Sequence, residues 1–124
     1  MKPVAIGENH LYSKVYAKGK KASGRLAAVY VLPDLRAKKL AAANPQKCKI
    51  NRIGLTVSKK LGGAVARNRC KRIIREGWRA VERERGVRCG FLVVIAARAA
   101  ALGAKSTEMQ KDLERSLEAL GMLQ

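Results

Sequence analysis

The run from Lys59 to Arg75 constrains the chain most, because a glycine pair is followed by a long segment that suits a helix with two contrasting faces. Gly62 and Gly63 break the chain, and neither proline nor glycine follows until Gly77. With Arg67 set at 0° on a helix of 100° per residue, one group of apolar residues falls between about 240° and 340°. This group is Ile73, Ala66, Gly77, Cys70, Val81 and Ile74. A polar group falls between 0° and about 200°: Arg67, Lys71, Arg75, Asn68, Arg79, Arg72, Arg83 and Arg69.

Such a helix has one face to bury and one face of guanidinium and ammonium groups. Like charges one turn apart repel each other, so the pattern predicts a polyanion that neutralises them. The whole chain agrees, since 27 Lys and Arg against 9 Asp and Glu give a net charge of +18. That charge favours nucleic acid or an anionic membrane as partner. A membrane is the weaker alternative, because the longest apolar run, Phe91 to Ala97, is far shorter than the ~20 residues of a spanning helix.

Length and cysteine content set further limits. A chain of 124 residues predicts a single domain, residues 1–124, with one modest core. The N-terminus has no long apolar centre, so we expect no secretory signal. Cys48, Cys70 and Cys89 are odd in number and form no C-x-x-C pair. They indicate reduced thiols in a cytoplasmic protein rather than a disulfide framework or a zinc site.

The basic run also resembles the signature of a known family, the protein subunit of bacterial ribonuclease P. The matching residues are Lys60-Leu61-Gly62-x-Ala64-Val65-x-Arg67-Asn68-Arg69-x-Lys71-Arg72-x-Ile74-Arg75. Two positions depart from the family pattern: Gly63 stands where a polar residue such as Asn is expected, and Cys70 where an aliphatic residue is usual. Cysteine keeps an apolar side chain that is readily buried. The resemblance covers nearly the whole chain and is weakest between Asp34 and Lys49.

Hydrophobic periodicity and turn residues predict the order helix, strand, strand, helix, strand, helix. The expected ranges are a helix from Glu8 or Asn9 to Gly19, strands at Arg25–Leu32 and Asn51–Ser58, the basic helix to about Arg85, a strand at Cys89–Ala97, and a helix from Ser106 or Thr107 to Gly121. Thr107 and Gln110 have the spacing of a capping box. A loop with a turn or two of helix at Leu35–Ala43 is expected between Asp34 and Lys49.

This order predicts an α/β (α+β) two-layer sandwich around a small sheet. The resemblance implies about four strands with three helices, one extra short strand whose place stays open, and a fold also found in a ribosomal-protein domain. It further implies a left-handed βαβ crossover through the basic helix. The general rule for parallel strands predicts a right-handed one.

Two tyrosines of the first helix have two interpretations. Tyr12 and Tyr16 are one helical turn apart, beside a second strip of Leu11 and Val15. They are either residues at the edge of the core or a platform that stacks unpaired bases, and the resemblance favours the platform. On the strand at 51–58, the small and polar face of Gly54, Thr56 and Ser58 fits either a close approach by a ligand or an exposed sheet face.

The sequence is poor in catalytic groups. His10 is the single histidine and has no Ser, Asp or Cys placed with it as in a known nucleophile arrangement. Glu76, Glu82 and Glu84 lie on the charged helix, where pairing with neighbouring arginines is the simpler role. The sequence therefore predicts a binding subunit whose partner performs the chemistry. The resemblance implies that a catalytic RNA, with Mg²⁺ bound mainly by that RNA and its substrate, removes the 5′ leader from precursor tRNA while the protein assists.

The resemblance and the charge pattern together give two predicted surfaces and no catalytic or metal-binding residue in the protein. The predicted contacts with the catalytic RNA are Lys59, Lys60, Arg67, Asn68, Arg69, Lys71, Arg72 and Arg75. The predicted leader-binding cleft consists of Tyr12, Tyr16, Tyr30 and Lys14. We expect no membrane contact and no obligate protein partner. A basic ribosomal-type RNA-binding protein and a protein-only nuclease are the rival functions.

Overall fold

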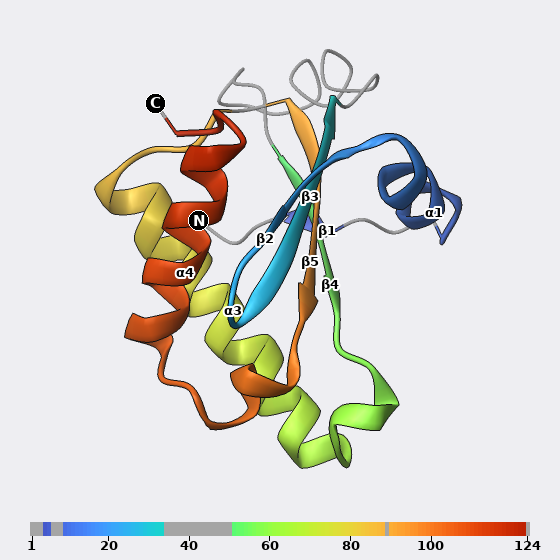
Figure 1. Ribbon diagram of the computed structural model, residues 1–124, viewed down its shortest axis with the longest axis vertical. Helices are drawn as coiled ribbons and strands as arrows, with labels where there is room; N and C mark the ends of the chain where they lie inside the picture. The colour runs from blue at the N-terminus through green and yellow to red at the C-terminus, as the bar shows by residue number, and fades with distance from the viewer. Residues whose placement is uncertain (1–3, 6–8, 34–50, 89, 124) are drawn as a thin grey trace.

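The computed structural model describes residues 4–5, 9–33, 51–88 and 90–123. The strands are β1 (Val4–Ala5), β2 (Lys20–Ser23), β3 (Ala27–Pro33), β4 (Arg52–Thr56) and β5 (Phe91–Ala97). The helices are α1 (Asn9–Lys18), α3 (Ala64–Glu84) and α4 (Ser106–Ala119), with short 3-10 helices η1 (Lys59–Leu61) and η2 (Ala99–Gly103). The sheet order is β1-β4-β5-β3-β2, with α3 and α4 on one face and α1 on the other (Figure 1).

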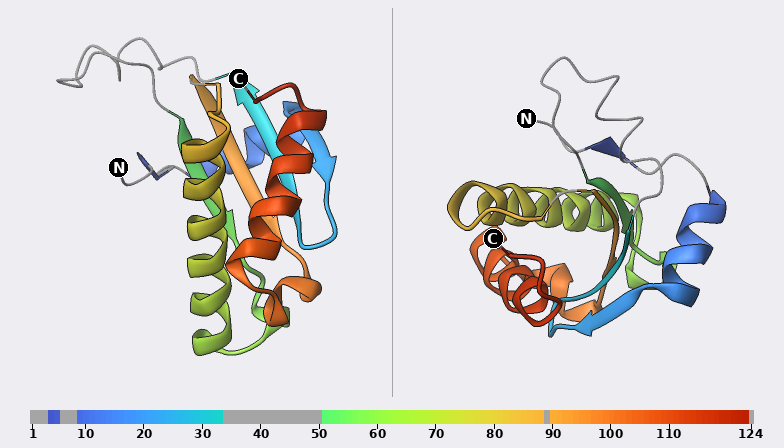
Figure 2. Two further views of the ribbon diagram at one scale, coloured as in Figure 1. Left: turned by 90° about the vertical axis from the view of Figure 1, so that its left-hand side faces the viewer. Right: turned by 90° about the horizontal axis from the view of Figure 1, so that it is seen from above.

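This arrangement confirms the predicted small sheet with three helices. Two short strands lie beyond the three predicted ranges, β1 beside β4 and β2 beside β3, and either fits the extra strand that the resemblance implied. β4 pairs with β5 in parallel, whereas β3 pairs with β5 and β2 in antiparallel fashion. In the left panel of Figure 2, α3 lies in front of the sheet, β4 and β5 run downward, and β5 is to the right of β4. The crossover is therefore left-handed, as the resemblance implied and against the general rule. The expected loop at 34–49 lies outside the described residues.

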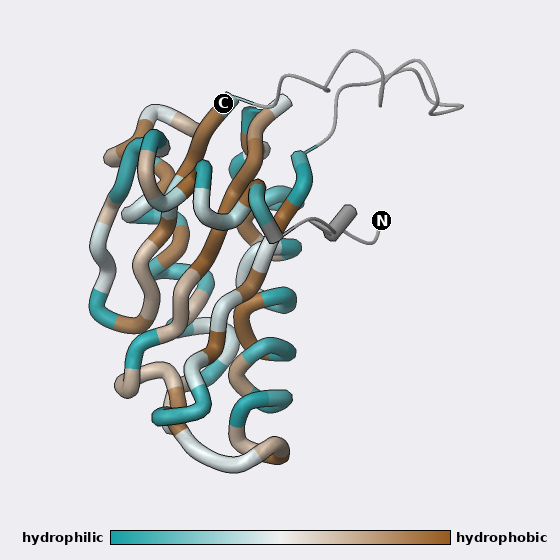
Figure 3. Tube along the Cα trace, turned by 90° about the vertical axis from the view of Figure 1, so that its right-hand side faces the viewer, coloured by the Kyte–Doolittle hydropathy of each residue, from teal (hydrophilic) through white to brown (hydrophobic). Residues whose placement is uncertain are grey.

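The main core lies between the sheet and the two helices α3 and α4. α3 buries the predicted apolar stripe, including Cys70, Ile73 and Ile74, and turns its hydrophilic residues outward (Figure 3). It also buries Trp78, which is 1% exposed and was not in the predicted stripe. Trp78 lies at about 20° on the helix, next to the basic residues, but its large apolar ring gains from burial. A second, smaller core under α1 contains Leu11 and Val15, as their spacing predicted.

Three elements and one helix cap differ from the sequence prediction. The strand β2 and the 3-10 helices η1 and η2 were not located from the sequence. β2 has no apolar alternation, and it forms through its pairing with β3, in which Lys21 lies opposite Tyr30. The capping box predicted for Thr107 is wrong, because α4 begins at Ser106 and the Glu108 carboxylate accepts the Lys105 backbone N–H at 3.1 Å.

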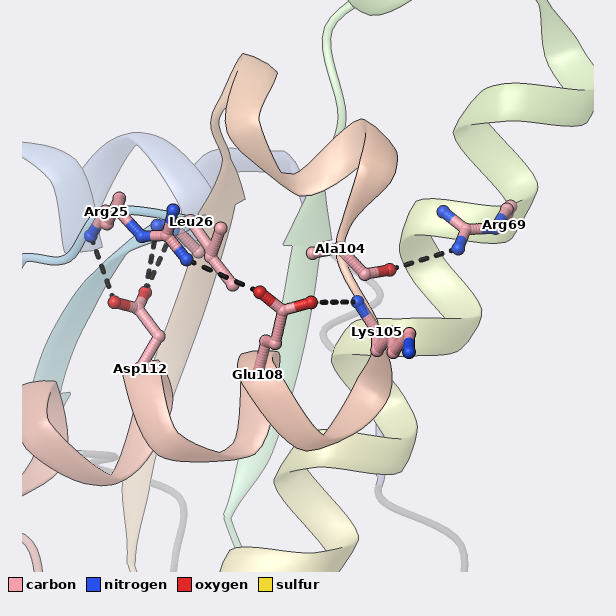
Figure 4. A network of polar contacts seen from close by, with 8 residues as sticks. Arg25, Leu26, Arg69, Ala104, Lys105, Glu108 and Asp112 are labelled. Carbon is pink, nitrogen blue, oxygen red and sulfur yellow. Dashed lines mark hydrogen bonds and ion pairs between the residues drawn. The ribbon is translucent and has the colours of Figure 1, made fainter.

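One carboxylate ties α4 to the turn between β2 and β3. Asp112 accepts the backbone N–H groups of three successive residues, Arg25, Leu26 and Ala27, at 3.0, 3.1 and 3.2 Å (Figure 4). A Cβ on Gly24 would lie 2.3 Å from Asp112 Oδ2, so the turn needs glycine for this close approach. The carboxylate thus replaces backbone partners that the turn cannot supply itself.

We expect Asp112→Ala to lower the free energy of unfolding by about 2–3 kcal/mol, because partly buried N–H groups lose a charged acceptor. Glu118→Ala on the same helix is the matched control, since Glu118 is exposed and surface changes stay within about 0.5 kcal/mol. Urea denaturation of both variants measures the difference. Equal stabilities would contradict the role of Asp112 in holding the turn.

Candidate nucleic-acid interface

The approach to α3 is a tight corner of two glycines. The Ser58 Oγ accepts the Lys60 backbone N–H at 3.2 Å and caps η1. Gly62 then has φ +143°, a conformation that side chains rarely adopt. Gly63 is the N-cap of α3, and its carbonyl accepts the Arg67 backbone N–H at 3.0 Å. The corner leads directly into α3, whose first turn exposes Ala64 and Val65 and half-buries Arg67.

The predicted RNA contacts do not all lie in the same environment. Lys59, Lys60, Asn68, Arg72 and Arg75 are exposed, whereas Arg67, Arg69 and Lys71 are half-buried. Within the described residues, the Nε of Arg67 is buried without a hydrogen-bond partner. The set is therefore divided between exposed polar side chains and half-buried cations that pack against the protein.

Arg69 is the clearest case of a cation used inside the protein. Its Nη1 donates to the Leu102 carbonyl at 2.7 Å, and its Nη2 donates to the Ala104 carbonyl at 3.0 Å. Figure 4 shows the second of these bonds just before α4 begins. Both carbonyls belong to the end of η2, so Arg69 fixes the connection from β5 to α4. Part of its guanidinium fork is therefore unavailable to RNA in the free protein.

Tyr16 and Tyr30 form an aromatic pair beside α1. Their ring centroids are 4.7 Å apart at an interplanar angle of 80°, an edge-to-face contact. Tyr16 is 39% exposed, and its hydroxyl lies 2.9 Å from Thr56 Oγ1. The Nζ of Lys21 lies 5.5 Å from the Tyr30 ring centroid, a cation–π contact. We call Tyr12, Tyr16 and Tyr30 the tyrosine surface.

Lys14 differs from its predicted place. It is two residues from Tyr12 and from Tyr16, so helical geometry puts it about 160° to 200° away, on the opposite flank of α1. The lysine that the structure brings to the tyrosines is Lys21, from the unexpected strand β2. Cross-strand pairing with Tyr30 is the signal that identifies it, and that signal was missing because β2 was not predicted.

Tyr12 joins the tyrosine surface to α3. It packs on Gly54, where a Cβ would lie 2.5 Å from its ring, so the small face of β4 accommodates a residue of the chain itself. Tyr12 also lines a cavity of ≈ 180 Å³, together with Ile53, Leu55, Lys71, Ile74, Arg75 and Trp78. Burial, and secondarily Tyr16, raise the pKa of Tyr12, so the ring stays a neutral phenol beside two cations. Lys71 and Arg75 thus border the tyrosine surface as well as the basic helix, which was not predicted.

The sequence of the chain matches one protein family over nearly its whole length. The family model described as Ribonuclease P matches residues 2–121. The chain belongs to the ribonuclease P protein family. Membership gives it a role in tRNA processing as the protein subunit of ribonuclease P.

Individual relatives agree with the family match. The ribonuclease P protein component of Clostridium botulinum is 33% identical over 117 residues, which covers 94% of this chain and 90% of the relative. The component of Symbiobacterium thermophilum is 37% identical, covering 91% and 87%. Among solved structures, the Staphylococcus aureus RNase P protein aligns with a TM-score of 0.73 and 28% identity, covering 99% of this chain and 100% of that chain.

In the described part of this ribonuclease P protein, few side chains are placed as catalytic or metal-binding groups would be. There, no group of three or more His, Cys, Asp or Glu side chains lies together as a metal site would require. Cys70 is a buried free cysteine, and burial raises the pKa of its thiol; Cys48 and Cys89 lie outside the described residues. Glu84 contacts Gln110 rather than an arginine. None of the described helices is long and apolar enough to cross a membrane.

The different environments of Arg69 and Arg72 generate a test on the free protein. We expect Arg69→Ala to lower the free energy of unfolding by about 1.5–3 kcal/mol, because two carbonyls lose a charged donor. Arg72→Ala should change it by less than about 0.5 kcal/mol, because Arg72 is exposed. Urea denaturation without RNA measures both. If the two variants have the same stability, the bonds from Arg69 to η2 contribute nothing to the fold.

Proposed function

We propose that this chain assists a catalytic RNA in removing the 5′ leader from precursor tRNA, by binding that RNA through α3 and the leader through the tyrosine surface. The observation that carries the proposal is the pairing of Tyr16 with Tyr30 beside Lys21, on the same molecule as the Arg-Asn-Arg helix. Stacking rings and cations are the groups that bind single strands without reading their sequence. Such binding suits an enzyme that processes many precursors.

The catalytic RNA binds the outward side of α3 and the corner before it. The residues of this surface are Lys59, Lys60, Arg67, Asn68, Lys71, Arg72 and Arg75, with Arg69 contributing the part of its fork that η2 leaves free. Guanidinium groups hold phosphates bidentately, which fixes the orientation of the helix on the RNA. Asn68 donates to and accepts from a base edge or a ribose hydroxyl.

The leader lies on the tyrosine surface, with its bases against Tyr16 and Tyr30. Lys71 and Arg75 line the cavity beside Tyr12, so they hold phosphates where the leader passes α3. The two RNA molecules therefore meet along one side of this helix. Cations between two polyanions lower their mutual repulsion.

The hydrolysis itself belongs to the RNA in this proposal. Mg²⁺ prefers octahedral oxygen ligands and often binds through phosphates, so we expect it to be held mainly by the catalytic RNA and the substrate. Metal ions of this kind activate the attacking water and stabilise the leaving oxygen. The protein raises their local affinity by bringing the two RNAs together. We expect the assembled enzyme in the cytoplasm and without an obligate protein partner.

Two rival functions remain distinguishable. A ribosomal-type RNA-binding protein shares the charge, but it gives no reason for an exposed aromatic pair beside the basic helix. A protein-only nuclease needs a carboxylate cluster that holds metal ions. Adding the purified protein to precursor tRNA separates them, because a nuclease cuts alone, a ribonuclease P subunit cuts only with its RNA, and a ribosomal protein cuts in neither case.

We expect the protein alone to leave precursor tRNA intact, and to lower the Mg²⁺ concentration that its partner RNA needs for cleavage. The physical reason is that a chain of charge +18 reduces the repulsion that Mg²⁺ otherwise has to screen. Cleavage is measured across a Mg²⁺ series with protein, RNA or both. Multiple-turnover cleavage by protein treated to remove all RNA would refute the expectation.

We expect Tyr16→Ala to weaken binding of precursor tRNA to the assembled enzyme by about 1–3 kcal/mol, the value of one stacked base. Mature tRNA has no leader, so its affinity should stay unchanged. Because Tyr16 is 39% exposed, its truncation should cost only the contacts with Tyr30 and Thr56 and lower the melting temperature modestly. Dissociation constants for both tRNAs measure the effect.

Tyr16→Phe is the matched control for this experiment. It keeps the ring that faces Tyr30 and removes only the hydroxyl bound to Thr56. Stacking predicts that the phenylalanine variant retains most of the affinity for precursor tRNA. Equal losses for precursor and mature tRNA in Tyr16→Ala, or a collapse of its melting temperature, would return Tyr16 to a role in the core.

A further inference from the structure

A second concave surface lies on the side of the sheet away from α1, between α4 and the turn that joins β2 to β3. Its cavity has a volume of ≈ 670 Å³. The apolar part of its lining comes from Ala22, Leu26, Ala119 and Leu120. The charged part comes from Arg25, Glu108, Lys111, Asp112 and Arg115. Lys21 also lines the cavity, but its ammonium lies over the Tyr30 ring. We call this surface the α4 groove.

The two acids of the α4 groove already have partners. The Asp112 carboxylate accepts three backbone N–H groups. Glu108 accepts the Lys105 N–H, and its other oxygen lies 3.5 Å from the Arg25 guanidinium (Figure 4). Among the lining residues, Glu108 is balanced by Arg25, whereas Asp112 keeps its charge, so one carboxylate stands against the two cations of α4.

The cations of α4 are in the opposite situation. Lys111 and Arg115 are exposed, and no ion pair or hydrogen bond joins either side chain to another residue in the part of the chain that the structure describes. They are one helical turn apart, so their charges repel each other. An anionic chain in the groove would neutralise both at once.

The α4 groove continues into the tyrosine surface around the edge of the sheet. β2 is the outermost strand on this side. Lys21 on this strand lines the groove, while its Nζ lies over the ring of Tyr30 on the other face. Tyr30 in turn contacts Tyr16. A single edge strand, β2, therefore separates the two surfaces at Lys21 and Ala22.

We infer that the α4 groove is a second binding site for single-stranded RNA, which takes the part of a long 5′ leader upstream of the nucleotides on the tyrosine surface. This inference rests on the proposed function, since it extends the path of the same leader across β2. Phosphates contact Lys111 and Arg115, and the accessible apolar lining at Ala119 and Leu120 accommodates ribose and base faces. Continuity with an aromatic pair favours RNA over an acidic peptide, because bases gain from stacking at the entrance.

The test uses the assembled enzyme and precursor tRNAs that differ only in leader length. Because single-strand sites cover roughly 4–16 nucleotides, the leaders have about 4 and about 20 nucleotides. Lys111→Ala/Arg115→Ala should lower affinity for the long-leader substrate about tenfold at 0.15 M salt and reduce its salt slope by about 1.4, at about 0.7 per cation. The short-leader substrate should keep its affinity.

The matched control is Arg88→Ala/Lys105→Ala, which removes the same charge from exposed positions outside the α4 groove. This control should change the affinity for the short-leader and the long-leader substrate by the same factor. A photoreactive uridine in the distal half of the long leader should crosslink to residues 108–120 in the wild-type enzyme. Melting curves confirm that the variants are folded.

The possible outcomes distinguish a failure of the α4 groove assignment from a failure of the proposed function. Equal losses for short and long leaders in the groove variant, or distal crosslinks only outside α4 and β2, would overturn the inference. Displacement of the long leader by oligoglutamate as readily as by oligouridylate would assign the groove to an acidic peptide instead. If Tyr16→Ala changes neither substrate while the groove variant still distinguishes leader lengths, the leader assignment of the tyrosine surface fails and the groove stands as an RNA site.

Discussion

Burial of one side of α3 is the constraint on which the rest of the structure depends. Ile73, Ile74 and Trp78 pack into the core between the sheet and α4, and each such side chain contributes about 1.5–3 kcal/mol on burial. Their burial fixes the rotation of the helix about its axis. Most of the basic residues must then face outward whether or not an anion is present, so hydrophobic packing holds together an array of like charges that would otherwise disfavour the helix.

Helical geometry then distributes these cations among three directions. Lys71 and Arg75 border the tyrosine surface, Arg72 faces solvent, and Arg69 bonds to η2. A single helix thus meets the two predicted RNA surfaces and also fixes the start of α4. The left-handed crossover matters here, because it sets on which side of β4 the helix lies and so brings Lys71 next to Tyr12.

Most of the fold could be predicted because periodicity and glycines act locally. The glycine pair and the apolar stripe located α3, alternation located β3 and β4, and a nearly continuous apolar run located β5. The features that were missed depend on partners that the residue pattern of the element does not reveal. β2 exists through its hairpin pairing with β3, and Arg69 bonds to carbonyls more than thirty residues away. The angular positions of Lys14 and Lys71 on their helices could have been worked out from the sequence. The residues of other elements that lie next to them could not.

The open edge of β2 has a consequence for the protein before it meets RNA. An outermost strand exposes unpaired backbone groups and invites pairing with another copy. This one begins with two exposed lysines, Lys20 and Lys21, in a chain of net charge +18. Two copies approaching edge to edge would bring four ammonium groups together, so self-association is opposed. Solubility of the free protein and its attraction to RNA therefore share one origin, and added salt weakens both.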